Sequence, residues 1–370
     1  MKKTSSRLAD GRELIYFDST DVSHQGEDDR LLSRPQLTSE LRYDPLLETW
    51  VIYASHRQDR TFLPDATHCP LCPSRPGHLT EVPDDRYEVV VFENRFPALM
   101  TGLADQVMQR DALSHGHSGD LLTERGAAGR CEVVCFTADH DAFFADLSPA
   151  RVDLVIDVLV DRTVELARIP GVEQVFCFEN SGSEIGVTQS HPHGQIYAYP
   201  FITPRTERML YAANSYYRRT RRNLFEDVLA AERSDGSRIV LATEQWTCFV
   251  PHAARWPFEV HCYPNRRVPD LAGLDLDQRA ELPEVLLDLY GRYSRLFDRP
   301  APYIAGWHQA PIREGRRHFA LHLELFTLQR AEHKLKYLAG SESGMDSFAN
   351  DVLPEVAAQR LRGVPREGVA

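Results

Sequence analysis

Two histidines and a glutamine alternate in the segment His191-Pro192-His193-Gly194-Gln195. If this segment is a strand, the side chains of residues 191, 193 and 195 point to one face. A neutral imidazole is a nucleophile near pH 7, and a carboxamide can donate a hydrogen bond to a developing negative charge. The pattern therefore favours attack on an anionic phosphorus centre. A pair of ordinary metal ligands, or polar residues facing water, would give the same pattern.

Two residues inside this segment predict its place in a sheet. Pro192 has no backbone N–H for a neighbouring strand, so we expect the segment at a sheet edge or at the start of a strand. Gly194 has no side chain beside His193, which we interpret as room for a ligand to approach closely.

Cys69 and Cys72 have the C-x-x-C spacing with which a turn directs two thiolates at one tetrahedral ion. The flanking Pro70 and Pro73 make the turn rigid. We predict a structural zinc ion here, with two further ligands from elsewhere in the chain. A redox-active pair is the rival interpretation, but no helix start follows the second cysteine. Two unrelated thiols are the simplest alternative.

Apolar and polar side chains alternate in the segment 318–325 as they do in a half-buried strand. The apolar side chains are Phe319, Leu321, Leu323 and Leu325. The polar face carries His318, His322 and Glu324. A histidine and a glutamate two residues apart on a strand can chelate a metal with a third ligand, for which His308 is available. A solvated strand face explains the pattern equally well.

Short strands and long helices must position these residues. Runs rich in Val, Phe, Tyr and Cys predict strands at 87–92, 132–136, 175–179, 195–199, 246–250, 259–263 and 318–327. Capping residues and helical apolar spacing predict one helix from Ser148-Pro149 to Pro170 and another after Asp275. We expect a third, more basic helix over residues 207–232, ending at Asp235-Gly236.

A faint internal repeat organises these elements. Phe92-Glu93-Asn94 and Phe178-Glu179-Asn180 each end a predicted strand, and the runs 132–136 and 259–263 each precede a long helix. A histidine-bearing run follows each helix, so we predict two copies of one α+β unit near residues 85–200 and 245–327. The chain then divides into an irregular N-terminal arm (1–40), an N-terminal half (41–235) and a C-terminal half (236–361), followed by a loose tail.

Composition restricts the class of protein. The chain has 370 residues, 42% of them hydrophobic, and no apolar run of membrane-spanning length, so we expect a globular protein without a membrane partner. The net charge of −12 argues against nucleic-acid binding. Seven cysteines, an odd number, with no secretory signal at the start, favour reduced thiols or metal ligands in a cytoplasmic protein.

The histidine segment, preceded by Phe178-Glu179-Asn180-Ser181-Gly182, resembles the active-site motif of the galactose-1-phosphate uridylyltransferase family. The resemblance covers residues 41–361. It includes Arg42-Tyr43-Asp44-Pro45, Ser55-His56-Arg57-Gln58-Asp59-Arg60, the Cys69–Cys72 pair, Ala138-Asp139-His140, Trp256-Pro257-Phe258-Glu259 and Gly306-Trp307-His308. It implies a duplicated histidine-triad-like fold of the α+β class, with helices packed on an antiparallel, half-barrel-like sheet, and this agrees with the repeat.

The resemblance also implies a reaction. UMP is exchanged between UDP-glucose and galactose 1-phosphate, giving UDP-galactose and glucose 1-phosphate, as a step of galactose metabolism. His193 would attack the α-phosphorus of UDP-glucose and carry the UMP as a uridylyl-histidine in a ping-pong reaction, while Gln195 contacts the phosphoryl oxygens. His140 and His191 would complete the zinc site with Cys69 and Cys72.

Matching to the family implies further binding positions and a homodimer in which the partner completes each active site. The substrate-binding positions are Arg57, Arg60, Asn94, Asn180, Thr188, Gln195, Lys336, Tyr337 and Glu342. Ser190 and Ser341 depart from the family pattern near the motif and at the sugar end. Met209 stands where the family has the glutamate of a second metal site. The remaining positions of that site are His308, His322 and Glu324.

Two other functions use some of the same residues. A related nucleotide-sugar or dinucleotide phosphorylase or hydrolase would use the same histidine, with phosphate or water as the acceptor. A nucleic-acid binder built on the cysteine pair is the alternative that is not an enzyme, and the negative charge of the chain disfavours it.

Overall fold

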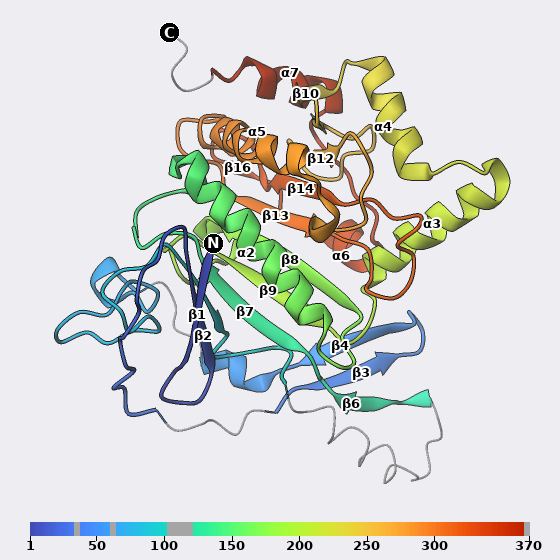
Figure 1. The fold of residues 1–370 in the computed structure, drawn as a ribbon. Helices are drawn as coiled ribbons and strands as arrows, with labels where there is room; N and C mark the ends of the chain where they lie inside the picture. The colour runs from blue at the N-terminus through green and yellow to red at the C-terminus, as the bar shows by residue number, and fades with distance from the viewer. Residues whose placement is uncertain (33–37, 60–63, 102–120, 366–370) are drawn as a thin grey trace.

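An eleven-stranded antiparallel sheet runs through the computed structural model, which describes residues 1–32, 38–59, 64–101 and 121–365 (Figure 1). From one edge to the other its strands are β1 (Lys2–Arg7), β2 (Glu13–Asp18), β5 (Val89–Glu93), β7 (Arg130–Cys135), β9 (His193–Tyr199), β8 (Gln174–Ser181), β13 (Tyr303–His308), β14 (His322–Thr327), β12 (Val260–Pro264), β11 (Trp246–Phe249) and β10 (Ile239–Ala242).

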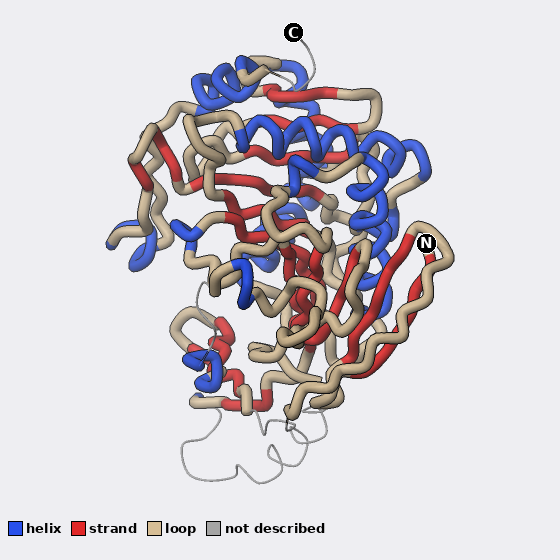
Figure 2. The backbone as a smooth tube through the Cα atoms, turned by 90° about the vertical axis from the view of Figure 1, so that its left-hand side faces the viewer, coloured by secondary structure: helices blue, strands red, loops and turns tan. Residues whose placement is uncertain are grey.

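Smaller sheets and the helices complete the fold. The smaller sheets are β4 (Thr49–Tyr53), β3 (Glu40–Asp44) and β6 (Glu124–Gly126), and β15 (Gln329–Ala331) with β16 (Lys334–Leu335). The helices are α2 (Pro149–Ala167), α3 (Pro204–Thr220), α4 (Leu224–Asp235), α5 (Leu276–Ser294), α6 (Gly340–Met345) and α7 (Pro354–Gly363). In Figure 2 most helices lie in the upper part of the molecule, and the part around the three-stranded sheet is mostly loop.

The central strands repeat one arrangement twice. In the N-terminal half the sheet order is β5-β7-β9-β8, so the fourth strand along the chain lies between the second and the third. The C-terminal half has the same arrangement, β11-β12-β14-β13. Each half inserts a 19-residue helix, α2 or α5, between its second and third strands. The two halves join where β8 pairs with β13. The predicted duplicated α+β fold is confirmed.

Helices α2 and α5 cover one face of this sheet. Ser148 caps α2 by accepting the N–H of Arg151, and Asp275 and Gln278 form a capping box at the start of α5. The apolar stripes of both helices pack in one hydrophobic cluster with alternate strand residues such as Ile196 and Leu323. Because side chains alternate along a strand, His193 and His322 project from the opposite face.

The N-terminal residues correct the expected irregular arm. Residues 2–18 form a hairpin, β1 with β2, and β2 pairs with β5 at the edge of the main sheet. Leu14 to Phe17 are buried, so the short apolar patch is a core strand. Strand β1 has no apolar pattern, because it lies at the sheet edge, where alternate side chains are half-buried and the others are exposed.

Three other expectations need correction. The helix expected over 207–232 is two helices, because Arg221 is in a left-handed conformation (φ 60°) and Asn223 caps α4. The strand expected at 318–327 begins at His322, and His318 turns toward Tyr217. The tail expected from about residue 361 still belongs to α7 until Gly363. Among the described residues, no helix is both long and apolar enough to cross a membrane.

Candidate active site and metal centre

Strand β9 has two chemically different faces. Its residues 194, 196 and 198 are buried, and Ile196 and Ala198 pack with the cluster under α2. His193, Gln195 and Tyr197 lie on the opposite face and are half-buried. The strand begins directly after Pro192, as the proline predicted. A side chain at Gly194 would meet the Phe136 ring at 2.8 Å, so this glycine makes room for the core and not for a ligand as expected.

The His193 ring is held in one tautomer. Its Nδ1 lies 2.7 Å from the backbone carbonyl oxygen of His191. Because a carbonyl can only accept, Nδ1 carries the proton and Nε2 keeps its lone pair. Burial lowers the pKa of His193, which favours the neutral ring. The structure therefore presents His193 Nε2 as a nucleophile or proton acceptor.

His193 lines two cavities. One, of about 720 Å³, is lined by Asn94, Thr188, Gln195 and His193, and the other, of about 920 Å³, by Asn180, Ser181 and His193. The polar side chains that line both cavities are of the kind that orients a small organic ligand. The structure thus brings together the predicted substrate residues Asn94, Asn180, Thr188 and Gln195 around the predicted nucleophile.

A chain of hydrogen bonds fixes the amide of Gln195. The hydroxyl of Tyr197 donates to Gln195 Oε1 (3.4 Å), and Arg57 Nη1 donates to the same hydroxyl (3.2 Å). With its oxygen engaged, the amide is left with its N–H groups as donors. Arg57 is thereby placed beside the site, whereas Arg60 lies outside the described residues.

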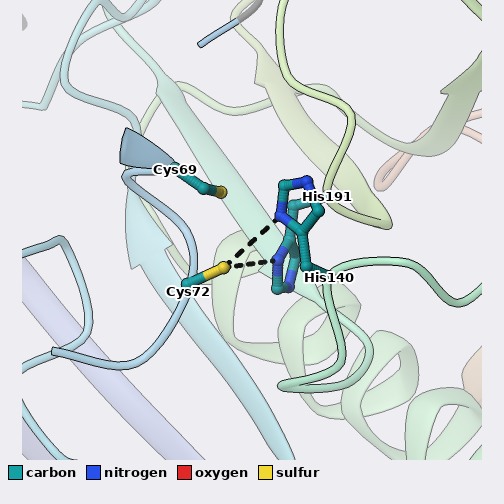
Figure 3. Close-up of side chains that lie close together, drawn as sticks. All are labelled: Cys69, Cys72, His140 and His191. Atoms are coloured by element: carbon teal, nitrogen blue, oxygen red, sulfur yellow. Dashed lines mark hydrogen bonds between the residues drawn. The ribbon is translucent and has the colours of Figure 1, made fainter. Parts of the chain in front are cut away.

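The four predicted zinc ligands converge on one point (Figure 3). The ligand atoms of Cys69, Cys72, His140 and His191 all lie within 4.8 Å of one another. Cys72 Sγ is 3.4 Å from His140 Nδ1 and 3.5 Å from His191 Nδ1. Sulfur and nitrogen ligands of one tetrahedral zinc ion are separated by about 3.6 Å, so the residues present fit such an ion.

Neighbouring groups orient these ligands. His191 Nε2 lies 2.9 Å from the carbonyl of Thr137 and 3.0 Å from the hydroxyl of Tyr87, so Nδ1 is the nitrogen left to face the cysteines. A hydrogen bond from Cys72, and then His191, lower the pKa of Cys69 to about 3 against the effect of burial. A thiolate in this place is the form that binds a metal.

A second cluster lies in the C-terminal half. Glu324 has one carboxylate oxygen 3.4 Å from His308 Nε2 and the other 3.4 Å from His322 Nε2, and all three residues are buried. His261 Nε2 is 3.6 Å from Glu324 but 2.8 Å from Glu259. Arg205 also donates to Glu324. Burial raises the pKa of Glu324, but His308 and His261 together hold it well below its usual range.

The predicted sugar-binding residues form a separate group. Lys336 and Glu342 are buried and paired with each other at 2.8 Å, and Tyr337 is 67% exposed. Lys336 lowers the pKa of Glu342 to about 2. Among the described residues, none of these three lines the cavities around His193.

Several site residues were missed by sequence reasoning. Tyr87, just before β5, contacts the candidate metal ligand His191, and Tyr197, in β9, contacts Gln195, but a lone tyrosine gives no signal in the sequence. His261 was detectable, because it alternates with Glu259. Arg205 has no signal of its own, since it lies among several arginines of a surface helix.

Comparison with known proteins gives consistent matches over both halves. Residues 31–203 match the family model for the N-terminal domain of galactose-1-phosphate uridyl transferase, and residues 210–368 match that for its C-terminal domain. The galactose-1-phosphate uridylyltransferase of Streptomyces lividans is 49% identical, with 98% of each chain covered. That of Thermotoga maritima is 36% identical, covering 87% of this chain and 98% of the relative.

A solved uridylyltransferase structure matches in three dimensions as well. It has a TM-score of 0.76 at 29% identity and covers 88% of this chain and 98% of its own. The matches span both repeats of the fold, and the N-terminal one includes the histidine segment at the start of β9. The chain therefore belongs to the galactose-1-phosphate uridylyltransferase family.

Proposed function

We propose that this enzyme exchanges UMP between UDP-glucose and galactose 1-phosphate through a uridylyl group on His193 Nε2. The observation that carries the proposal is the hydrogen bond from His193 Nδ1 to the His191 carbonyl, which leaves Nε2 unprotonated on a residue that lines two cavities. Relatives named for this activity support the substrate pair.

The proposed reaction has two displacements. Nε2 attacks the α-phosphorus of UDP-glucose, an N–P bond forms, and the bond to the oxygen of glucose 1-phosphate breaks. A phosphate oxygen of galactose 1-phosphate then attacks the same phosphorus, and the N–P bond breaks to restore His193. Gln195, with its oxygen held by Tyr197, donates to the phosphoryl oxygens as negative charge develops. Asn94, Asn180 and Thr188 hold the nucleotide.

Intact mass tests the covalent step. Enzyme given UDP-glucose alone gains the mass of one uridylyl group and releases one equivalent of glucose 1-phosphate. The adduct persists in water and disappears when galactose 1-phosphate is added. A hydrolase would lose the adduct in water, and a phosphorylase would lose it on addition of inorganic phosphate.

The ion at the cysteine and histidine cluster is proposed to be zinc. Two thiolates and two imidazoles are the donor set of structural zinc sites, and their spacing fits a tetrahedral ion. The ion would brace the backbone at His191, whose carbonyl orients the His193 ring. The cytoplasmic location also stays a proposal, supported by seven cysteines that form no disulfide.

Arg57 is proposed to act on phosphate binding both directly and through Tyr197. We expect Arg57→Ala to lower kcat/KM by about 10- to 100-fold, because a charge-assisted donor is lost and the Tyr197 hydroxyl loses its partner. Initial rates over a matrix of both substrates measure this. Arg42→Ala is the matched control, since Arg42 is exposed and pairs with Glu40. Unchanged KM values and kcat in Arg57→Ala would refute the role.

We further propose a homodimer in which Lys336, Tyr337 and Glu342 serve the partner's active site. Their separation from the cavities around His193 in one chain supports this arrangement. Mixing inactive His193→Gly and Lys336→Ala chains should then restore activity, toward about one quarter of the wild type, because one site of each mixed dimer carries neither change. Mixtures of two His193→Gly preparations serve as the control. A dimer mass with no recovery after subunit exchange would contradict shared sites.

A further inference from the structure

The C-terminal half holds a counterpart of the His193 site. His322 and Glu324 begin β14 as His193 and Gln195 begin β9, the equivalent strand of the other half. His322 Nδ1 lies 2.9 Å from the carbonyl of Ala320, two residues earlier, which repeats the contact of His193 with His191. Both imidazoles therefore present Nε2 to the same face of the sheet.

The counterpart is closed to substrates. Tyr263 stacks on the His322 ring with centroids 4.7 Å apart, and Phe225 and Phe319 pack around it. His322 and Glu324 are 1% and 3% exposed. A carboxylate buried among imidazole rings needs a cation, which here is either a metal ion or a protein group.

Three possible ligands surround the point where an ion would lie. His308, His322 and Glu324 have ligand atoms within 4.8 Å of one another. A fourth is engaged elsewhere, since His261 Nε2 contacts Glu259 at 2.8 Å. Glu324 Oε1 has no hydrogen-bond partner among the described residues, so one oxygen remains available as a ligand.

Positive charge already reaches this carboxylate. Arg205, in the first turn of α3, donates through Nη2 to Glu324 Oε2. The other carboxylate of the cluster, Glu259, has His261 Nε2 at 2.8 Å, so each carboxylate already has a nitrogen partner. A divalent ion beside the guanidinium of Arg205 would meet its repulsion in a buried site.

We propose that the guanidinium of Arg205 is the resident cation of this cluster, and that His308, His322 and Glu324 form a latent metal site which opens when Arg205 is removed. Helix α3 presents Arg205 and, one turn later, Met209 on the side of the cluster. The helix therefore supplies a guanidinium cation and no carboxylate that could bind a metal ion. The ion pair also fastens the start of α3 to β14. This inference does not depend on the proposed reaction.

Metal stoichiometry of the full-length chain tests the proposal. Purified wild type, Arg205→Met and the control Arg208→Met are equilibrated with excess Co²⁺, separated from free ion and analysed for metal. Arg208 lies on the same helix but pairs with the exposed Asp346. We expect one ion per chain in wild type and Arg208→Met, and two in Arg205→Met. The second ion adds visible cobalt absorption without thiolate charge-transfer bands, because its ligands are nitrogen and oxygen.

Thermal unfolding gives an independent readout. Zn²⁺ beyond the first equivalent should raise the Tm of Arg205→Met and leave that of wild type unchanged. Two ions per wild-type chain, or a folded Arg205→Met chain that still takes one, would overturn the proposal. If Arg205→Met does not fold, Glu324→Gln gives the test. We expect this variant to bind one ion per chain, as the wild type does, because Glu324 is not a metal ligand in the wild type. If the wild type binds two ions and Glu324→Gln binds one, the proposal is overturned.

Discussion

We expect replacement of His193 by glycine to slow UMP transfer by at least ~10³-fold, as removal of a nucleophile does. His193 lines both cavities with its Nε2 unprotonated, and Gln195 can stabilise charge but cannot form the N–P bond. Glycine at this half-buried position leaves the proposed metal ligand His191 in place, so we expect the fold and the metal content to stay intact. Steady-state rates, metal analysis and intact mass with UDP-glucose measure the three effects.

His318→Gly is the control for loss of an imidazole outside the proposed active site. His318 lies outside β14, contacts Tyr217 and takes no part in either cluster. That variant gains a full uridylyl label and transfers it at the wild-type rate. The mechanism is lost if His193→Gly is still labelled by UDP-glucose, or if peptide mapping of the wild type places the label on His191.

Repeated short patterns made the core of the fold predictable from sequence. The two strand runs that precede the long helices lie at equivalent positions, in β7 and β12. The two histidine runs that follow the helices also lie at equivalent positions, in β9 and β14. Helices α2 and α5 were equally clear, because Ser148 and Asp275 are strong caps ahead of an apolar stripe. These signals are local, so a single sequence contains them.

The features of the fold that the sequence did not predict depend on tertiary contacts. Strand β1 has a polar sequence and is held by its backbone ladder to β2, which no side-chain pattern reveals. The break between α3 and α4 falls at Arg221, where neither glycine nor proline marks a left-handed residue. The prediction that Gly194 leaves space for a ligand is wrong for a similar reason. Alternation along a strand shows which face a residue is on, but not that Phe136 packs against that face.

The site shows the same division. The spacing of Cys69 and Cys72 is enough to predict them as metal ligands. His140 and His191 are 68 and 119 residues away from Cys72, and only the family resemblance predicts them. In the second cluster the sequence showed His322 and Glu324 on one strand face. It could not show that Arg205, 119 residues before Glu324, points at the same carboxylate. Charge compensation inside a fold is a property of packing.

Loss of the zinc site is the second large effect. We expect Cys69→Ser to reduce the metal content from one zinc per chain to near zero and the free energy of unfolding by more than ~3 kcal/mol. A serine hydroxyl is a poor zinc ligand, and Cys69 is buried among the groups that hold the loop to β5 and β7. Transfer should fall as well, because the proposed ion would fix His191, and the carbonyl of His191 orients the His193 ring.

Cys248→Ala separates the metal effect from simple loss of core packing. Cys248 is fully buried in β11, far along the sheet from the zinc ligands, so its loss leaves a small cavity and costs about 1 kcal/mol. It should keep one zinc and normal transfer. Metal analysis, denaturant unfolding and the uridylylation rate are measured on both variants. Cys69→Ser protein that retains stoichiometric zinc would contradict the four-ligand site, and normal uridylylation of zinc-free protein would show that His191 needs no metal to position the nucleophile.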